Sequence, residues 1–320
     1  MKPTIYITRK IDDQIVEKIR ETCEIEMWPE EDTPVPRSVL EEKIQKIDGL
    51  FCLLTETIDK TLLEKAENLK VVSNLAVGYN NIDIQSAKEK GITVTNTPGV
   101  LTETTADLTF ALMMATARRL VEGSSYLRAG EWKTWSPMQL TGHDIYGANL
   151  GIIGMGRIGE ALAKRALGFD MNVVYHNRSR KQEAEEKYSI TYVSMDQLLK
   201  ESDFVCVLTP YTKETHDLIG EKELSLMKET AILINTARGG IVNEEALYNT
   251  LKDNKIWAAG LDVFEEEPVP LDHPLLTLPN VVTLPHIGSA SIKTRLKMAN
   301  VAADNLIKSL KNERPEYVVV

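Results

Sequence analysis

Short apolar runs alternate with amphipathic segments along most of this chain. In its first part, apolar runs predict strands, and apolar residues at helical spacing predict helices between them. The predicted strands are residues 4–7, 24–27, 50–54, 71–75 and 93–95, and the predicted helices include 39–47 and 59–66. Such alternation is typical of an α/β domain with a parallel sheet.

The alternation resumes in the second part of the chain, after a long helical pattern at 102–121. Predicted strands there are 150–153, 172–175, 204–208, 231–235, 258–263 and 281–284, and helices are expected at 160–168 and 291–311. The last helix is long enough to lead the chain back to the first domain. We therefore predict two α/β domains, one made of residues 1–100 with 288–320 and the other of residues 101–287.

A glycine pattern, G-x-G-x-x-G, joins the predicted strand 150–153 to the helix after it. Gly154 permits a tight strand-to-helix turn, Gly156 lets the backbone approach a pyrophosphate, and Gly159 allows close helix–strand packing. The free amides at the helix N-terminus suit the phosphates. Such a turn can also be purely structural, but the strand before it, the helix after it and a second strand at the expected distance favour dinucleotide binding.

The residues after that second strand indicate which dinucleotide is bound. Where an NAD-binding unit carries an acidic residue for the ribose 2′-hydroxyl, the chain has Asn177, followed by Arg178, Ser179 and Arg180. These residues would attract a 2′-phosphate, because a guanidinium presents a planar fork to phosphate oxygens. The run could instead be a solvated basic turn, since Lys181 extends it. We predict that NADP(H) is preferred and that NAD(H) remains possible.

Composition narrows the class of protein. With 320 residues, 43% of them apolar and 26% charged, the chain has the composition of a globular protein of two domains. Its net charge of −10 argues against binding to nucleic acid. Cys23, Cys52 and Cys206 are odd in number and widely spaced, which favours free thiols over disulfides or metal ligands. No signal peptide or membrane span is evident, so a cytoplasmic protein without membrane or metal partners is expected.

Three polar residues of the second domain follow predicted strands, where α/β folds place their chemistry. Arg238 follows the strand 231–235, Glu267 lies beyond 258–263, and His286 comes directly after 281–284. Each of them alone is more often structural. Together they match what reduction of a ketone needs: a cation that polarises the carbonyl, an imidazolium that donates the proton, and a carboxylate that orients the imidazole and favours its protonated form.

The ordered motifs of the chain resemble those of the D-isomer-specific 2-hydroxyacid dehydrogenases, and among these the glyoxylate/hydroxypyruvate reductases. The motifs cover essentially the whole chain: Val77-Gly78, Gly154-Met-Gly-Arg-Ile-Gly159, Asn235-Thr-Ala-Arg238-Gly, Gly260-Leu-Asp262-Val, Glu267-Pro268 and Pro285-His-Ile-Gly-Ser289.

The resemblance implies two Rossmann-like or flavodoxin-like domains, with the active site in the cleft between a substrate-binding domain (1–100 with 288–320) and a dinucleotide-binding domain (101–287). Its implied catalytic residues are Arg238, Glu267 and His286. Its implied substrate-binding residues are Val77, Gly78, Arg238, His286 and Ser289. The cofactor-binding residues are those implied by the resemblance together with the basic turn 177–180. They are Gly154, Met155, Gly156, Arg157, Ile158, Gly159, Asn177, Arg178, Ser179, Arg180, Thr209, Pro210, Thr236, Ala237, Arg238, Asp262, His286 and Gly288.

The resemblance also implies a homodimer that forms through the cofactor domain. The segment 132–137 is similar to the dimer arm of the reductases, which can present an aromatic residue to the neighbouring active site. We interpret Trp132 as ordinary interface packing, whereas for Trp135 both interpretations stay open.

The implied activity is NADPH-dependent reduction of glyoxylate and hydroxypyruvate to glycolate and D-glycerate, with His286 as the general acid. One alternative is a reductase of a larger 2-keto acid, such as 2-ketogluconate, with Leu53, Leu54 and Met138 shaping the pocket. Oxidation of 3-phosphoglycerate is disfavoured, because no extra basic cluster would serve a second phosphate. A nucleotide-sensing protein that resembles the corepressors of this fold is the alternative from another class.

Overall fold

The computed structural model describes residues 2–320, which divide into two compact units. Unit 1 contains residues up to Leu101 together with Ala290–Val320, and unit 2 is Thr102–Ser289. The sequence placed these boundaries at 100/101 and 287/288, one or two residues earlier. Each unit has a parallel sheet of its own, as the predicted fold class requires.

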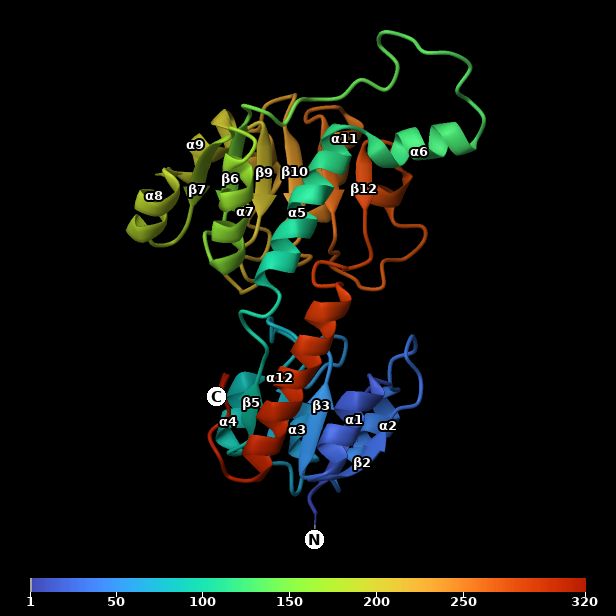
Figure 1. Cartoon of the computed structure of the whole chain (residues 1–320), viewed down its shortest axis with the longest axis vertical. Helices are drawn as coiled ribbons and strands as arrows, with labels where there is room; N and C mark the ends of the chain where they lie inside the picture. The colour runs from blue at the N-terminus through green and yellow to red at the C-terminus, as the bar shows by residue number, and fades with distance from the viewer. Residues whose placement is uncertain (1) are drawn as a thin grey trace. The chain divides into compact units, whose positions relative to one another are not determined.

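Unit 1 is built on a five-stranded parallel sheet with the strand order β2-β1-β3-β4-β5 (Figure 1). Its elements are β1 (Thr4–Ile7), α1 (Asp13–Arg20), β2 (Glu24–Met27), α2 (Arg37–Lys43), β3 (Gly49–Cys52), α3 (Lys60–Glu64), β4 (Val71–Asn74), α4 (Ile84–Glu89), β5 (Thr93–Thr95) and α12 (Ile292–Leu310). Buried apolar side chains cover both faces of the sheet, and its strands β1 and β3 are mostly apolar, whereas the edge strand β2 alternates glutamate with apolar residues. On one face, α12 contributes Ala299, Ala302, Ala303 and Leu306 to the core.

Unit 2 is built on a seven-stranded parallel sheet with the order β12-β11-β10-β9-β6-β7-β8 (Figure 1). Its elements are α5 (Thr102–Ala117), α6 (Leu120–Arg128), β6 (Asn149–Ile153), α7 (Arg157–Leu167), β7 (Asn172–His176), α8 (Gln182–Tyr188), β8 (Thr191–Tyr192), α9 (Met195–Glu201), β9 (Phe204–Val207), α10 (Glu221–Leu224), β10 (Ile232–Asn235), α11 (Glu244–Lys252), β11 (Ala258–Leu261), the 3₁₀ helix η1 (Pro274–Thr277) and β12 (Val281–Thr283). Two buried apolar clusters again lie on opposite faces of the sheet.

In each unit the order of the strands reverses at one point, which is where such sheets form a crevice at their carboxyl edge. In unit 1 this point, between β1 and β3, is filled by a buried ion pair between Arg9 and Glu56 (3.3 Å), with the Thr8 hydroxyl donating to the same carboxylate. In unit 2 it lies between β6 and β9. There the glycine turn of residues 154–156 follows β6, so only unit 2 keeps this position for a dinucleotide.

The single long helix predicted at 102–121 is wrong, because the chain breaks it into α5 and α6. Arg119 has a left-handed backbone conformation (φ 52°), and the carbonyl of Ala117 accepts the N–H of His143 at 3.0 Å instead of the next helical N–H. After α6 the chain leaves the sheet of unit 2 as an extended loop before it returns to β6 (Figure 1).

Candidate active site

The three predicted catalytic residues all lie at the carboxyl edge of the sheet of unit 2. Arg238 follows β10, Glu267 follows β11 and His286 follows β12, and these strands are neighbours in the sheet. Because parallel strands end at the same edge, the fold brings together residues that are far apart in the sequence.

His286 and Glu267 form a hydrogen-bonded ion pair with 2.6 Å between Nδ1 and Oε2. The other oxygen of Glu267 accepts the N–H of Phe264 at 3.0 Å. Burial alone would raise the pKa of Glu267, but the hydrogen bond and charge of His286, with smaller contributions from Phe264 and Arg238, bring that pKa below its usual value. The carboxylate therefore stays charged at neutral pH, and Nδ1 of the imidazole carries a proton.

The second ring nitrogen of His286 is available for chemistry. Within residues 2–320, Nε2 has no hydrogen-bond partner, and the side chain is 23% exposed. An imidazole that is held at Nδ1 by a carboxylate and open at Nε2 can exchange a proton with a bound substrate.

Asp262 fixes the turn that carries His286. Its two carboxylate oxygens accept the N–H groups of Ile287 and Gly288, each at 2.8 Å, and its carbonyl accepts the N–H of His286 at 2.9 Å. His286 itself has a left-handed backbone conformation (φ 53°), which costs free energy for a residue with a Cβ and persists only where the surroundings impose it. Burial raises the pKa of Asp262, and the two N–H groups and the charge of His286 oppose that rise. The predicted contact of Asp262 with a nicotinamide carboxamide stays a prediction.

Arg238 is held by its own loop, and most N–H groups of its guanidinium are without a hydrogen-bond partner in the described chain. The side chain of Asn235 bridges the loop: its amide nitrogen donates to the carbonyl of Arg238 at 2.9 Å, and its oxygen accepts the N–H of Ala237 at 3.1 Å. The guanidinium donates one bond, to the carbonyl of Ala237 at 2.7 Å, and its other donors have no partner within residues 2–320. Burial lowers the pKa of Arg238 and the charge of Glu267 opposes this, but a guanidinium stays protonated.

A glycine lets the Arg238 loop lie against the Glu267 loop. A Cβ on Gly239 would come within 1.9 Å of the backbone of Phe264, so any other residue would push the two loops apart. On the other side, Thr236 is tied to α5: its hydroxyl lies 2.7 Å from that of Thr109, which itself donates to the carbonyl of Thr105 at 2.8 Å. Thr109 has already used its proton, so Thr236 must be the donor between the two hydroxyls. Thr109 could not be recognised from the sequence, because a threonine inside a helix has no distinctive pattern.

The glycine turn has the geometry expected of a dinucleotide-binding loop. Gly154 has φ 105°, and a Cβ there would come within 2.5 Å of the N of Thr209, on the neighbouring strand connection. A Cβ on Gly159 would meet the carbonyl of Gly154 at 2.5 Å, whereas one on Gly156 would meet nothing within 4 Å. The open backbone at Gly156 stands directly at the N-terminus of α7, which begins at Arg157, three residues earlier than predicted. A pyrophosphate fits this arrangement of open backbone and helix N-terminus.

The residues after β7 have different environments. Asn177 pairs with the peptide groups of Met155: its Oδ1 accepts the N–H at 2.7 Å and its Nδ2 donates to the carbonyl at 3.2 Å. Arg180 is bound by Glu185, with 2.6 Å from Nη2 to Oε2. Arg178 is exposed and makes no hydrogen bond or ion pair within residues 2–320, and its charge is felt by the more distant Glu214.

The remaining predicted site residues are divided between the units. Thr209, Pro210, Thr236, Ala237, Gly288 and Ser289 lie in unit 2 on connections that follow strands, and Arg157 and Ile158 lie in the first turn of α7. Met155 turns its side chain into the core, so only its backbone can face a ligand. Val77 and Gly78 lie in unit 1, in the loop after β4.

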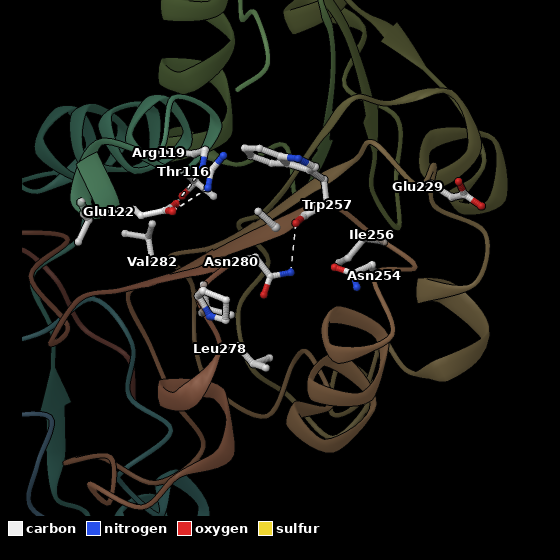
Figure 2. A pocket seen from close by; sticks show the side chains of 14 residues that line it. Thr116, Arg119, Glu122, Glu229, Asn254, Ile256, Trp257, Leu278, Asn280 and Val282 are labelled. Atoms are coloured by element: carbon white, nitrogen blue, oxygen red, sulfur yellow. Dashed lines mark hydrogen bonds and ion pairs between the residues drawn. The ribbon is translucent and has the colours of Figure 1, made fainter. Parts of the chain in front are cut away.

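A pocket of about 500 Å³ in unit 2 holds none of these residues (Figure 2). It lies at the amino ends of β11 and β12, next to the break between α5 and α6, and is lined by Trp257 and the Arg119–Glu122 ion pair among others. The predicted catalytic residues lie beyond the carboxyl ends of the strands, so this pocket is distinct from the predicted catalytic site.

Other classes of site find no support in the described part of the chain. Within residues 2–320, no group of three or more His, Cys, Asp or Glu side chains is placed to hold a metal ion, and no helix is long and apolar enough to cross a membrane. Cys23, Cys52 and Cys206 are buried and free, as predicted. Burial raises the pKa of the Cys23 thiol to about 11, so it is not a reactive thiolate.

Comparison with known proteins agrees with this geometry and defines the class of protein as a nicotinamide-dependent oxidoreductase. Residues 110–288 match the family described as "D-isomer specific 2-hydroxyacid dehydrogenase, NAD binding domain". The whole chain is 50% identical to a glyoxylate reductase of Korarchaeum cryptofilum over 96% of that protein, and 52% identical to one of Thermococcus litoralis over 97%. The chain belongs to the D-isomer-specific 2-hydroxyacid dehydrogenase family.

Solved structures extend this similarity to three dimensions. A crystal structure from Thermus thermophilus is 45% identical and superposes with a TM-score of 0.93, covering 99% of this chain and all of that one. An NADPH-dependent glyoxylate/hydroxypyruvate reductase of Sinorhizobium meliloti, in complex with NADP and malonate, is 31% identical with a TM-score of 0.88, covering 100% and 97% of the two chains.

Proposed function

We propose that this chain reduces glyoxylate and hydroxypyruvate to glycolate and D-glycerate, with NADPH as the preferred cofactor. The observation that carries the proposal is the His286–Glu267 pair, which leaves Nε2 open at the same sheet edge as the unpaired donors of Arg238. The names of the relatives point to the same substrates.

Each residue then has one task. When bound, the reduced nicotinamide supplies a hydride to the carbonyl carbon. Arg238 binds the carboxylate and the keto oxygen, whose negative charge grows toward the transition state. His286 delivers its Nε2 proton to that oxygen, and Glu267 keeps the ring oriented and favours its charged form. The amides of Val77 and Gly78 hold the substrate carboxylate, and Ser289 borders the same substrate. In this proposal residues 1–100 with 288–320 are the substrate-binding domain, and 101–287 the dinucleotide-binding domain.

The preference for NADPH rests on the basic turn after β7. No carboxylate stands in the run from Asn177 to Arg180, and Asn177 already uses its amide to hold Met155. Of the two arginines, Arg178 is the stronger candidate for the 2′-phosphate, because Arg180 must first give up its bonds to Glu185. Ser179, between them, adds a hydroxyl donor.

The decisive experiment compares kcat/KM for NADPH and NADH in three proteins. Charged hydrogen bonds contribute about 1.5–3 kcal/mol, so we expect the unmodified enzyme to favour NADPH by roughly tenfold to a hundredfold. Arg178→Ala should remove most of that preference and Arg180→Ala much less. Equal kcat/KM for both cofactors in the unmodified enzyme would mean that the run is a solvated turn. A panel of 2-keto acids that includes 2-ketogluconate, measured with the preferred cofactor, tests the substrate.

We also propose a homodimer formed through α6 and the loop that follows it. None of the residues of α6 is buried, and apolar side chains stay exposed along this segment: Leu120, Val121, Leu127, Trp132, Trp135, Met138 and Tyr146. Val121 and Glu122, from the first turn of α6, also line the pocket described above, which Figure 2 shows with Glu122 labelled. An apolar surface of this extent is typical of an interface.

Sedimentation velocity tests the dimer. Leu127→Glu should shift the enzyme from dimer to monomer, because it places a charge in the apolar contact. Leu271→Glu makes the same change at a residue that is 95% exposed outside the arm, and should leave the dimer intact. A monomeric unmodified enzyme, or a dimeric Leu127→Glu variant, would contradict the proposal.

A further inference from the structure

The loop after β4 in unit 1 has three consecutive peptide groups whose carbonyl oxygens are all tied down. Their hydrogen bonds are Thr97 N–H to Ala76 O at 2.9 Å, Asn96 Nδ2 to Val77 O at 2.8 Å, and Asn74 Nδ2 to Gly78 O at 2.9 Å. Two of the three donors are side-chain amides, and Nδ2 of Asn74 also donates to Oδ1 of Asn81 at 3.4 Å.

These bonds also orient the N–H groups of the loop. A trans peptide group is planar, and its N–H points away from its C=O. Holding the three carbonyls therefore also fixes the N–H groups of Val77, Gly78 and Tyr79, each at the edge of its peptide group opposite the held carbonyl. None of these three N–H groups donates to another residue in the range 2–320. The loop lies at the carboxyl edge of its sheet, and unpaired backbone amides there attract anions.

We infer that Asn74 and Asn96 are positioning residues for the substrate carboxylate, and that the amide of Tyr79 joins those of Val77 and Gly78 in binding it. This inference rests on the proposed 2-keto acid substrate and adds two side chains and one amide to its binding site. Neither asparagine touches the substrate. Each acts through the peptide group that it holds.

Both asparagines are themselves held in place. Asn74 is fully buried, and its Oδ1 accepts the thiol of Cys52 at 3.7 Å, which leaves Nδ2 directed at Gly78. The carbonyl of Asn96 accepts Nδ2 of Asn305, from α12, at 3.2 Å. Both asparagine side chains are neutral, so they hold the loop without introducing a charge that would change its attraction for a carboxylate.

The test compares the same substitution, Asn to Asp, at Asn96 and at Asn80 of unit 1. Asn96→Asp replaces the donor by an acceptor that repels the carbonyl of Val77. Asn80→Asp adds the same charge near the loop, at an exposed residue without a hydrogen bond in the described chain. We expect Asn96→Asp to raise KM for glyoxylate and Ki for oxalate by roughly tenfold, with a smaller change in kcat and in KM for NADPH, because the carboxylate is bound alike in ground and transition state. Asn80→Asp should change each constant by less than about twofold.

Values of KM and Ki for Asn96→Asp that match those of Asn80→Asp, at an unchanged Tm, would overturn the role of Asn96. Asn74→Ser, which removes the other amide without adding a charge, should give the same pattern. Should both variants fail to fold, the unmodified holoenzyme labelled with ¹⁵N decides: oxalate should shift the amide signals of Val77, Gly78 and Tyr79. An unshifted Tyr79 signal would remove it from the site. If oxalate shifts these signals but glyoxylate is not reduced, the proposed function fails and the anion-binding loop stands.

Discussion

Two histidine–glutamate pairs support the same turn of unit 2, and only one of them is placed for catalysis. The first joins His286 Nδ1 to Glu267 Oε2 at 2.6 Å, and the second joins His273 Nε2 to Glu244 Oε2 at 3.0 Å. The free oxygen of each glutamate accepts a neighbouring backbone N–H, that of Phe264 for Glu267 and that of Glu265 for Glu244.

The pairs differ at the second nitrogen of the imidazole. Nδ1 of His273 accepts the N–H of Leu275 at 3.3 Å and caps η1, so both of its nitrogens are used. Nε2 of His286 has no hydrogen-bond partner within residues 2–320. His286 lies in the turn after β12, at the sheet edge that also carries Arg238. A carboxylate beside a histidine therefore does not by itself define an acid catalyst. The proposed acid role needs the open Nε2 of His286, at the sheet edge that also carries Arg238.

The largest expected effect is the loss of kcat on replacing His286, with the same substitution at His273 as the control. His286→Asn should lower kcat for glyoxylate reduction by roughly 10²–10⁴-fold, the range typical of a general acid, with little change in cofactor affinity. His273→Asn keeps a side-chain oxygen that can cap η1, and should lower kcat by less than about threefold. Steady-state kinetics of both variants at one pH separate the pairs. Similar losses of kcat in the two variants would contradict the assignment of His286.

Arg238→Lys tests the cation that distinguishes the catalytic edge. An ammonium cannot bind two oxygens in the fixed fork of a guanidinium, so we expect KM to rise and kcat to fall, with kcat/KM lower by roughly tenfold to a hundredfold. A lower kcat is expected because the bond to the keto oxygen strengthens toward the transition state. Unchanged kinetics would mean that Arg238 does not bind the substrate.

The smallest effect is a shift in pH dependence on neutralising each glutamate. The pKa of Glu267 is lowered, so this side chain is fully ionised at a pH above the usual carboxyl range. It becomes protonated only as the pH falls through the lowered value. At neutral pH, Glu267→Gln removes a charge that favours the imidazolium. Reduction needs that imidazolium, so its rate should begin to fall at a lower pH than in the unmodified enzyme. Glu244→Gln should leave the kcat profile in place. A profile that moves equally in both variants would show a general change of charge and not a specific pair.

Much of the fold and of the catalytic set could be predicted from the sequence because parallel strands impose a strong local pattern. The strands at 4–7, 24–27 and 93–95 have the predicted bounds, and the other predicted strands differ by one or two residues at one or both ends. The short edge strand β8 was not predicted. Arg238, Glu267 and His286 could be singled out as candidates because each follows an apolar strand of the predicted sheet. Short helices such as α1, α4 and α9 were missed, since they depend on one cap each, from Asp12, Asp83 and Ser194, and on few apolar residues.

The sequence by itself determined the alternation of strands and helices, the glycine turn and the choice of candidate catalytic side chains, because these depend on local periodicity and on residue chemistry. Only the tertiary structure decided which groups stay open. Arg180 is bound by Glu185 whereas Arg178 is not, and His273 is used at both nitrogens whereas His286 is used at one. Neither Asn74, at the end of β4, nor Asn96 has a distinctive sequence pattern, and only the fold directs the amide of Asn96 at Val77 and that of Asn74 at Gly78. Several of these contacts join residues only two to five positions apart, as in Arg180–Glu185, His273–Leu275 and Asn74–Gly78, but the folded backbone decides which of the nearby groups meet.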